Sequence, residues 1–438
     1  MPFISGPSGS DGINIDESSC SVNSVNAVTT ESRIPSGVPI ECENTLYEVG
    51  NGSLNLTYRS THIYPKTICV LENGLIILQD STYLRVLKYA NNGLQLIRSS
   101  SLPTNLQDGS TYGEGIDIHP LSGDKAIILA VRKPNVTASV VSVTESSVTF
   151  GTVYTYNANI SSMSLHSTKL NNASILLACT FSSSVVGVSV LSINNTAISF
   201  STPINTEFTY LYNIERLSNK YAVLINTTYA ILLTISNNSV SASSQLYYIV
   251  SDYTSFSGTY GPFVTNEKLY LFMTPSGNYN AIVGLYCSNG TLKSTDTYLY
   301  PAANSEPWYP NGEYSSNIDT WSQYGIYKIT DNTILITYYN ISSKKIRETT
   351  FRYGLWKQST GGTDMMIPHS VNEYASAYEY RSYIMINHDT MVCFDYSSSS
   401  PTTYRIIKIR PTVRRAGYRV DGISTSDITT NGGTCVLL

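Results

Sequence analysis

Short runs of apolar residues recur along most of the chain, and this repetition constrains the fold more than any other feature. In the clearest unit, residues 68–97 contain four such runs. The first pair is separated by Asn73-Gly74 and the second pair by Asn91-Asn92-Gly93. Asn-Gly pairs supply the positive φ angles that a tight β-hairpin requires. The unit therefore predicts four short antiparallel strands.

The most hydrophobic strand of this unit returns six more times. Its central residues are separated by 51, 49, 47, 47, 64 and 50 residues. A period near 50 residues with about four strands per unit is typical of a β-propeller. We therefore predict an all-β fold, a propeller of about seven four-stranded blades over residues 46–410. An array of separate β-sandwich domains is the alternative, which the continuous period and the lack of Pro-rich linkers disfavour. The central residues are Ile77, Ile128, Leu177, Leu224, Leu271, Leu335 and Met385, with Met391–Cys393 as the alternative strand for the last unit.

The two ends of the chain lack this pattern. Residues 1–45 are rich in Ser, Asn and Gly and show little periodicity, which indicates an extended N-terminal arm or attachment segment. Residues 411–438 follow the last apolar repeat and are predicted as a short C-terminal tail.

Composition excludes several classes of protein. The chain of 438 residues has 27 Lys and Arg against 31 Asp and Glu, and only 13% of its residues are charged. A nucleic-acid partner is therefore not expected, because such binding needs a dense basic face. Disorder is excluded by the plentiful β-branched and aromatic residues, which include 35 Tyr. A polar, uncharged surface suits extracellular or particle-borne proteins that contact sugars or other proteins.

The sequence predicts synthesis in a cytosol and no membrane insertion. Its first residues have neither the basic nor the apolar segment of a signal peptide. No stretch approaches the ~18 apolar residues that a membrane span requires. The seven cysteines are scattered without a CxxC pair, so neither a disulfide framework nor a zinc site is expected. We predict no metal and no cofactor.

One step of the repeat is longer than the others by some fifteen residues, and the extra chain lies within Tyr298–Tyr324. Aromatic rings stack on sugars while Asn, Asp and Glu bind hydroxyl groups. The same residue types anchor protein interfaces, and the tryptophans could also simply pack between blades. These three roles stay open. The predicted ligand-binding residues are Trp308, Tyr309, Glu313, Tyr314, Asp319, Trp321 and Tyr324.

Catalysis has little support in the sequence, and we predict no catalytic residues. The five histidines form no HExxH motif, and neither a GxSxG elbow nor a P-loop is present. Two acidic and aromatic clusters, Asp108–His119 and His369–Tyr374, could hold the paired carboxyl groups of a glycosidase. A carbohydrate-active propeller enzyme is therefore the alternative function.

The last four residues, Cys435-Val436-Leu437-Leu438, match the prenylation pattern in which Leu favours a geranylgeranyl group. Prenylated tails usually carry an additional basic or lipid signal. Residues 424–434 contain no basic residue, so we favour a C-terminal β-strand over a lipid anchor.

The end of the chain also carries a resemblance. Val420–Ser424 followed by Thr430–Val436 is similar to the closing segment of many tailed-phage structural proteins, with Ser424 where alanine is commoner. The repeated body behind a Ser/Asn-rich arm also resembles β-propeller proteins of phage tails, baseplates and fibres.

This resemblance implies a virion protein, present in several copies in a symmetric assembly after synthesis in the host cytoplasm. Its arm, residues 1–45, would bind other virion proteins, and its propeller loops would bind a host-surface glycan or protein. A purely architectural virion spacer or capsid decoration is a further alternative.

Overall fold

The computed structural model describes residues 24–54, 67–79, 82–107, 115–157, 159–181, 185–211, 213–226, 228–236, 239–249, 263–265, 268–273, 280–294, 298–300, 321–330, 333–340, 345–358, 364–375, 380–397, 400–417 and 422–437. The chain divides into two compact units. One is Leu46–Ile409, and the other combines Met1–Thr45 with Arg410–Leu438. Strands β2 (Pro39–Leu54) and β32 (Ser400–Arg415) each run from one unit into the other.

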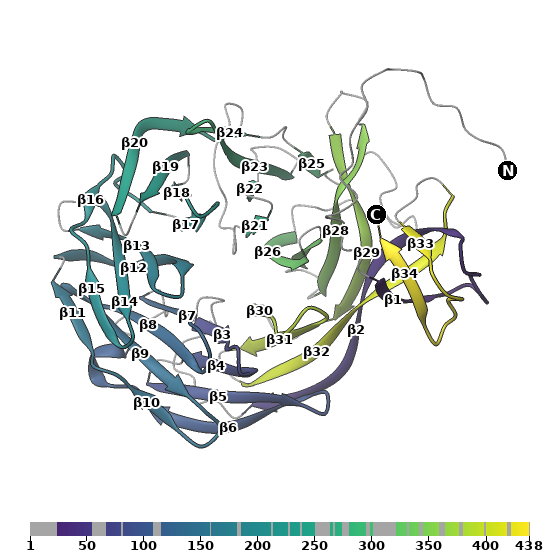
Figure 1. Cartoon of the computed structure of the whole chain (residues 1–438), viewed down its shortest axis with the longest axis horizontal. Coiled ribbons are helices and arrows are strands. Elements are labelled where there is room, and N and C mark those ends of the chain that lie inside the picture. The colour runs from purple at the N-terminus through teal and green to yellow at the C-terminus, as the bar shows by residue number, and fades with distance from the viewer. Residues whose placement is uncertain are drawn as a thin grey trace. The chain divides into compact units, whose positions relative to one another are not determined.

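The described strands of the larger unit form antiparallel sheets that follow one another along the chain (Figure 1). The first sheet contains β3 (Ile68–Val70), β4 (Leu75–Gln79), β5 (Tyr83–Ala90) and β6 (Gly93–Ser101). The second contains β7 (Ile116–Pro120), β8 (Lys125–Arg132), β9 (Asn135–Val143), β10 (Val148–Phe150) and β11 (Tyr154–Asn157). The third contains β12 (Ile160–Asn171), β13 (Ser174–Phe181), β14 (Val186–Asn194), β15 (Ala197–Phe200) and β16 (Ile204–Asn205). The fourth contains β17 (Asn213–Arg216), β18 (Tyr221–Ile225), β19 (Tyr229–Ser236) and β20 (Ser239–Tyr248).

The remaining sheets complete this unit. The fifth contains β21 (Phe263–Thr265), β22 (Lys268–Met273), β23 (Asn280–Ser288), β24 (Thr291–Ser294) and β25 (Tyr298–Tyr300). The sixth contains β26 (Trp321–Thr330), β27 (Thr333–Asn340), β28 (Lys345–Gln358) and β29 (Asp364–Ala375). The last contains β30 (Tyr380–Met385), β31 (Thr390–Ser397) and β32, with β2 beside β32.

The first strands of successive sheets contact one another in the order β3, β7, β12, β17, β21, β26 and β30, and β30 in turn contacts β3. Sheets arranged around a common centre with their first strands innermost form a β-propeller. The prediction of an all-β propeller fold is therefore confirmed.

The apolar repeat marks equivalent strands. Six of its seven central residues lie on the second strand of their sheets, from β4 to β27. The seventh, Met385, lies on the first strand of its sheet, and the alternative Met391–Cys393 lies on the second strand, β31. The predicted hairpins also form, since Asn91 has φ 52°, Asn92 has φ 57° and Gly74 has φ 82°.

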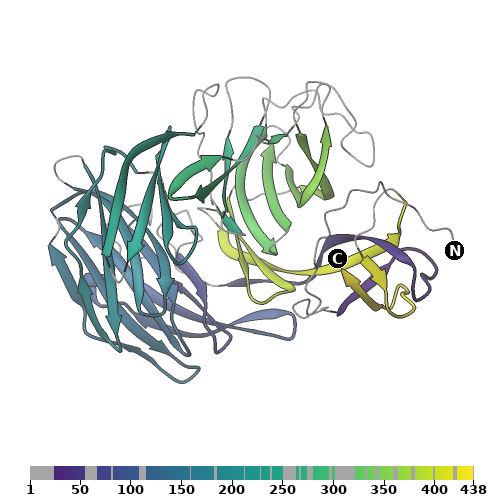
Figure 2. The same ribbon diagram turned by 45° about the horizontal axis from the view of Figure 1, so that its top comes forward.

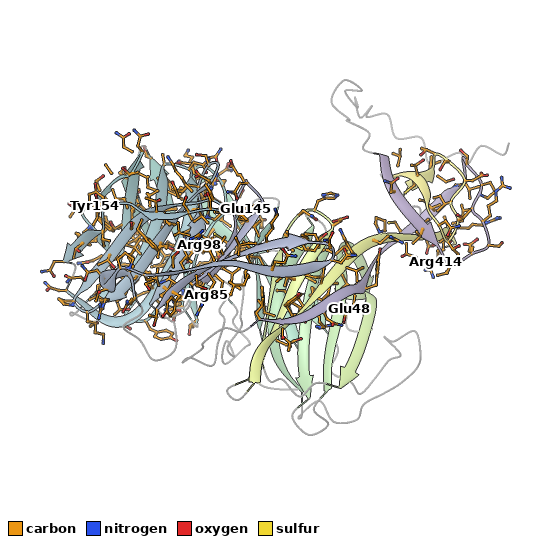
Figure 3. The ribbon with its side chains drawn as sticks, turned by 90° about the horizontal axis from the view of Figure 1, so that it is seen from below. Glu48, Arg85, Arg98, Glu145, Tyr154 and Arg414 are labelled. Atoms are coloured by element: carbon orange, nitrogen blue, oxygen red, sulfur yellow. The ribbon has the colours of Figure 1, made fainter. Side chains whose placement is uncertain are left out.

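The apolar runs are continuous because the second strands are buried on both faces. In β8, Ile128 packs toward the first sheet, while Ile127 and Leu129 pack toward the third. Figure 2 shows these sheets stacked face to face. Between the first two sheets, Lys88 Nζ lies 2.6 Å from Oε1 of Glu145, the residue labelled in Figure 3.

The last sheet joins both ends of the larger unit, because β2 comes from its beginning and β32 from its end. This sheet meets the first sheet at Tyr404, which is buried. The Tyr404 hydroxyl accepts a hydrogen bond from Leu94 N–H at 3.0 Å and donates one to Leu94 O at 3.2 Å. Gly52 makes room for the ring, because a Cβ there would lie 2.6 Å from the Tyr404 hydroxyl.

The smaller unit is a closed β-structure built from both ends of the chain. Strand pairing runs from β1 (Ser24–Thr29) to β34 (Gly433–Leu437), β33 (Gly422–Ser424), β2 and β32, and β32 pairs in parallel with β1. The segments predicted as an arm and as a tail thus share one sheet over their described residues. Closure leaves no free edge among these strands. Its core contains Ala27, Ile34, Ile40, Cys42, Val413, Ile428 and Cys435.

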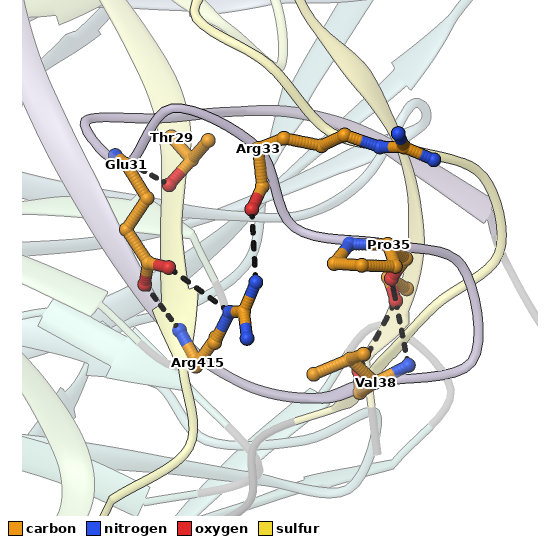
Figure 4. Close-up of polar contacts among 7 residues, drawn as sticks. Thr29, Glu31, Arg33, Pro35, Val38 and Arg415 are labelled. Atoms are coloured by element: carbon orange, nitrogen blue, oxygen red, sulfur yellow. Dashed lines mark hydrogen bonds and ion pairs between the residues drawn. The ribbon is translucent and has the colours of Figure 1, made fainter.

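Polar contacts hold the loop between β1 and β2 in this unit (Figure 4). Glu31 accepts a hydrogen bond from Arg415 N–H at 2.8 Å, and its other carboxylate oxygen lies 3.2 Å from Arg415 Nε. Arg415 also donates to Arg33 O at 3.2 Å. The buried Ser424 hydroxyl donates to Pro35 O at 2.6 Å and accepts from Val38 N–H at 2.9 Å. Ser424 thus holds the loop against β33 through two hydrogen bonds of its hydroxyl group, which alanine lacks.

We expect Ser424→Ala to lower the free energy of unfolding of the smaller unit by about 1–3 kcal/mol, because Val38 N–H and Pro35 O lose their partner. Hydrogen exchange of the Val38 amide measures this directly. Thr425→Ala, which removes only an exposed hydroxyl contact with Thr434, is the matched control. Equal protection of the Val38 amide in both variants would contradict the assignment.

Among the described residues, no helix is long and apolar enough to span a bilayer.

Candidate functional site

The structure describes only part of the aromatic loop predicted to bind a ligand. Trp308, Tyr309, Glu313, Tyr314 and Asp319 lie outside the described residues. The backbone places the other two residues, Trp321 and Tyr324, in strand β26. There Trp321 lies opposite Asn340 of β27, and Tyr324 lies at a shift in the strand register.

The cluster Asp108–His119 is described from residue 115 onward, and its end forms strand β7. Asp117 and His119 alternate along this strand with Ile116 and Ile118, which pack toward the first sheet. Their strand partners Leu129 and Ile127 belong to the core between the second and third sheets. Asp117 and His119 therefore face the third sheet. The other predicted cluster, His369–Tyr374, lies on β29 of the sixth sheet.

Opposite them, strand β12 of the third sheet presents Ser167. The Ser167 hydroxyl donates a 2.7 Å hydrogen bond to Asp117 Oδ2 and lies 2.7 Å from His119 Nε2. Asp117 Oδ1 lies 3.7 Å from the same nitrogen. The Asp117 and His119 side chains are 6% and 15% exposed, so this polar group lies in a largely dry environment where its hydrogen bonds are strong.

This geometry differs from that of a nucleophilic triad. In a triad, the carboxylate holds one imidazole nitrogen so that the other nitrogen can take the serine proton. Here Asp117 and Ser167 both approach Nε2 of His119. Because its hydroxyl donates a hydrogen bond to Asp117, Ser167 is better placed to orient the carboxylate than to attack a substrate.

Lys169 lies two residues after Ser167 on the same face of β12. Its Nζ donates a 2.5 Å hydrogen bond to Pro120 O. Burial lowers the pKa of Lys169, and the charge of Glu72 opposes this shift. Burial also lowers the pKa of His119; the Asp117 charge opposes that shift and the Lys169 charge adds to it. His119 is therefore held neutral within this group.

The next inner strand, β17, adds a partly buried acid that the sequence did not single out. Burial raises the pKa of Glu215 to about 8; a hydrogen bond from Asn213 opposes the shift, and the Asp117 charge adds to it. Asn213 Nδ2 donates this bond to Glu215 Oε1 at 3.1 Å. A carboxyl group with this pKa holds its proton at neutral pH. In the sequence, the only indication of a role for Glu215 was its position. It lies about one repeat after Ser167, on an expected inner strand.

We call Asp117, His119, Ser167, Lys169, Asn213 and Glu215 the inner-strand cluster. Its members come from the first strands of three successive sheets. Within the described part of the chain, no group of three or more His, Cys, Asp or Glu residues is arranged to hold a metal ion. The chemistry that the cluster supports is hydrogen bonding and proton transfer.

Three residues of the C-terminal prenylation pattern, Cys435, Val436 and Leu437, lie in strand β34. Cys435 is fully buried in the core of the smaller unit and pairs with Val25 and Ser424. The prediction of a C-terminal β-strand is confirmed. A lipid on this sulfur would require the strand to leave its sheet.

Comparisons with known proteins give only distant similarities. No family model matches the chain, and no curated protein matches it. Similar solved structures include a protein from Lactobacillus plantarum, with 10% identity, a TM-score of 0.47, and coverage of 76% of this chain and 100% of that chain. The periplasmic gluconolactonase of Pseudomonas aeruginosa has 9% identity, a TM-score of 0.46, and coverage of 86% and 100%. The WD40 domain of SCAP from fission yeast has 8% identity, a TM-score of 0.39, and coverage of 78% and 84%. Similarities at this level carry no conclusion about this chain.

Proposed function

We propose that the chain is a virion structural protein of a tailed phage, in which a seven-bladed propeller presents loops for attachment to the host surface. The observation that supports this most is the smaller unit. Its hairpin β33–β34 contains the C-terminal pattern that resembles phage structural proteins, and the hairpin pairs with the N-terminal strand β1.

The two units would then have separate tasks. The smaller unit would bind neighbouring virion proteins together with residues 1–23, and the propeller would be free to contact the host. A propeller leaves only short outer sheet edges, which suits this role, since many copies on one particle must not aggregate edge to edge. The low fraction of charged residues, 13%, fits contact with an uncharged glycan or with a protein surface.

The segment between β25 and β27 is the proposed contact surface. We expect Trp308→Ala combined with Trp321→Ala to reduce adsorption of particles to host cells at least tenfold, because aromatic anchors dominate interfaces of this kind. The measurement is the adsorption rate of particles carrying the variant protein. Particle yield and protein content serve as controls and should not change.

Cross-linking mass spectrometry of the native particle tests the whole proposal. Cross-links from residues 24–45 and 410–437 to other virion proteins, with residues 298–324 free of them, are the expected result. Cross-links from residues 298–324 to a virion partner would instead indicate an architectural spacer. Absence of the protein from purified particles would contradict the proposal.

A further inference from the structure

We propose that Tyr210 and the third sheet of the propeller form a binding surface for a neutral glycan. This inference rests on the proposed attachment role and names for it a ligand class and a contact residue in the described part of the chain.

Tyr210 is the most exposed of the large hydrophobic residues that the structure describes. It is 57% exposed, whereas Ile423, Leu246 and Leu96 are 44%, 38% and 38% exposed. An exposed tyrosine offers a partner both an apolar ring and a polar hydroxyl group. Such side chains contribute much of the binding energy where they contact a partner.

The loop that carries Tyr210 is anchored on both sides of it. Phe208 and Leu211 are 2% and 4% exposed and belong to the core between the third and fourth sheets. Phe208 O accepts a 2.8 Å hydrogen bond from Val186 N–H, and the Thr206 hydroxyl donates one to Val186 O at 2.9 Å. The backbone around Tyr210 is therefore fixed before a ligand arrives, which lowers the entropy cost of binding.

This loop lies on the face of the propeller that the proposed function assigns to host contact. It connects β16, in the third sheet, to β17, the first strand of the fourth sheet. In a propeller, every connection from the outer strands of one sheet to the inner strand of the next lies on the same face. Strand β25 ends at Tyr300 and β26 begins at Trp321, so these two strand ends share that face with Tyr210.

The charge of the third sheet indicates the class of ligand. No charged residue occurs between Lys169 and Glu207, and this stretch includes all of β13, β14, β15 and β16. Its exposed residues include Ser199, Thr202 and Asn205. A charged ligand would find no counter-charge on these strands, whereas the hydroxyl groups of a sugar form hydrogen bonds with hydroxyl and amide groups.

A second aromatic contact lies on the outer strands beside this stretch. Phe200 of β15 stacks on Tyr156 of β11, with ring centroids 5.1 Å apart and an angle of 15° between the ring planes. Both residues are partly buried. Aromatic rings among uncharged polar groups suit the apolar faces and hydroxyl groups of a sugar. Protein interfaces favour aromatic residues together with Arg, and β13 to β16 contain no Arg.

Affinity electrophoresis of the full-length protein tests the inference, in gels that contain starch, dextran, laminarin, galactan or mannan. Retardation by at least one of these neutral polysaccharides is the expected result. Tyr210→Ala should raise the dissociation constant at least tenfold, while Tyr210→Phe, which keeps the ring, should bind almost as well as the wild type. Leu96→Ala truncates another exposed apolar side chain, on β6 of the first sheet, and should leave binding unchanged.

Three outcomes would overturn the proposal: no retardation by any of these polysaccharides, retardation only by the charged polysaccharides alginate and heparin, or equal binding by the wild type and Tyr210→Ala. Reduced adsorption of particles carrying Tyr210→Ala, without binding to any polysaccharide, would likewise overturn it and indicate a protein partner. Denaturant unfolding curves identical to the wild type would show that the variants are folded.

The electrophoresis uses the purified protein, whereas the virion role is tested by the protein content and the cross-links of particles. Failure of glycan binding at Tyr210 and failure of the virion role are therefore distinguishable.

Discussion

At pH 8.5 the Glu215→Gln variant should be more stable than the wild type, by about 2–4 kcal/mol. Glu215 is partly buried, and only Asn213 donates a side-chain hydrogen bond to it among the contacts of the described residues. Forcing a charge onto this carboxyl group therefore costs free energy in the folded state. Gln has nearly the same shape, can accept the same hydrogen bond, and has no charge to bury.

The sign follows from proton binding. The pKa of Glu215 is raised from an ordinary 4.5 to about 8, so between these two values the folded protein holds a proton that the unfolded chain has lost. Stability from this group is fully present below about pH 4.5 and is lost as the pH rises through about 8. The variant does not lose this stability. The difference in the free energy of unfolding between the two proteins should therefore grow as the pH rises from about 4.5 to about 8.

Denaturant unfolding of both proteins at pH 4.5, 6.5 and 8.5 measures the effect. His119 changes stability in the opposite direction below its ordinary pKa, because burial lowers its pKa, but it is present in both proteins and cancels in the difference. Glu207→Gln, which changes an exposed acid on the loop before β17, is the matched control. A constant difference between Glu215→Gln and the wild type over the whole range would show that Glu215 ionises normally in the folded protein.

Tyr404→Phe should lower the free energy of unfolding of the larger unit by about 1–3 kcal/mol, because both backbone groups of Leu94 lose their hydrogen-bonding partner. The Leu94 side chain and the Tyr404 ring are buried, and water has little access to replace the hydroxyl. The change leaves the ring and its packing in place, so the loss reports on the hydrogen bonds alone.

The matched control is Tyr89→Phe, which removes an exposed hydroxyl that contacts Asn92 within the β5–β6 hairpin. We expect this variant to unfold within about 0.5 kcal/mol of the wild type. Both are measured by denaturant unfolding at neutral pH, with hydrogen exchange of the Leu94 amide as a local readout. Rapid exchange at Leu94 in Tyr404→Phe alone would locate the damage at the junction of the first and last sheets.

The sequence predicted the propeller because its signal is local and repeated. An apolar strand such as Ala126–Leu129 is buried on both faces wherever it occurs in a stack of sheets, so its composition is informative without knowledge of its neighbours. The last repeat was harder to place. Tyr383 and Met391–Cys393 are both buried in the same sheet, and burial alone does not distinguish its first strand from its second.

The inner-strand cluster could be predicted only in part. Asp117 and His119 both fall within Asp108–His119, which the sequence singled out as an acidic and aromatic cluster. Ser167 lies on another sheet, and only the stacking of β7 and β12 brings it against Asp117 and His119. Glu215 lies one sheet further along, on β17. The pairing of the chain ends was not predicted, because it also joins segments that are far apart in the sequence. No local pattern in residues 24–29 indicates that they pair with residues 433–437.

The topology also has a consequence for folding. Residues 46–54 leave the ribosome early, but the strand beside them, β32, is made only after every strand from β3 to β31. Strand β1 likewise cannot pair with β34 until the end of the chain has been synthesised. Contacts between such distant segments form slowly because the intervening chain must first be ordered. The sheets from β3 to β29 can form in order of synthesis, whereas the last sheet and the smaller unit can form only at the end. A chain that stops before residue 400 lacks β32, β33 and β34. It can therefore complete neither the last sheet of the propeller nor the smaller unit.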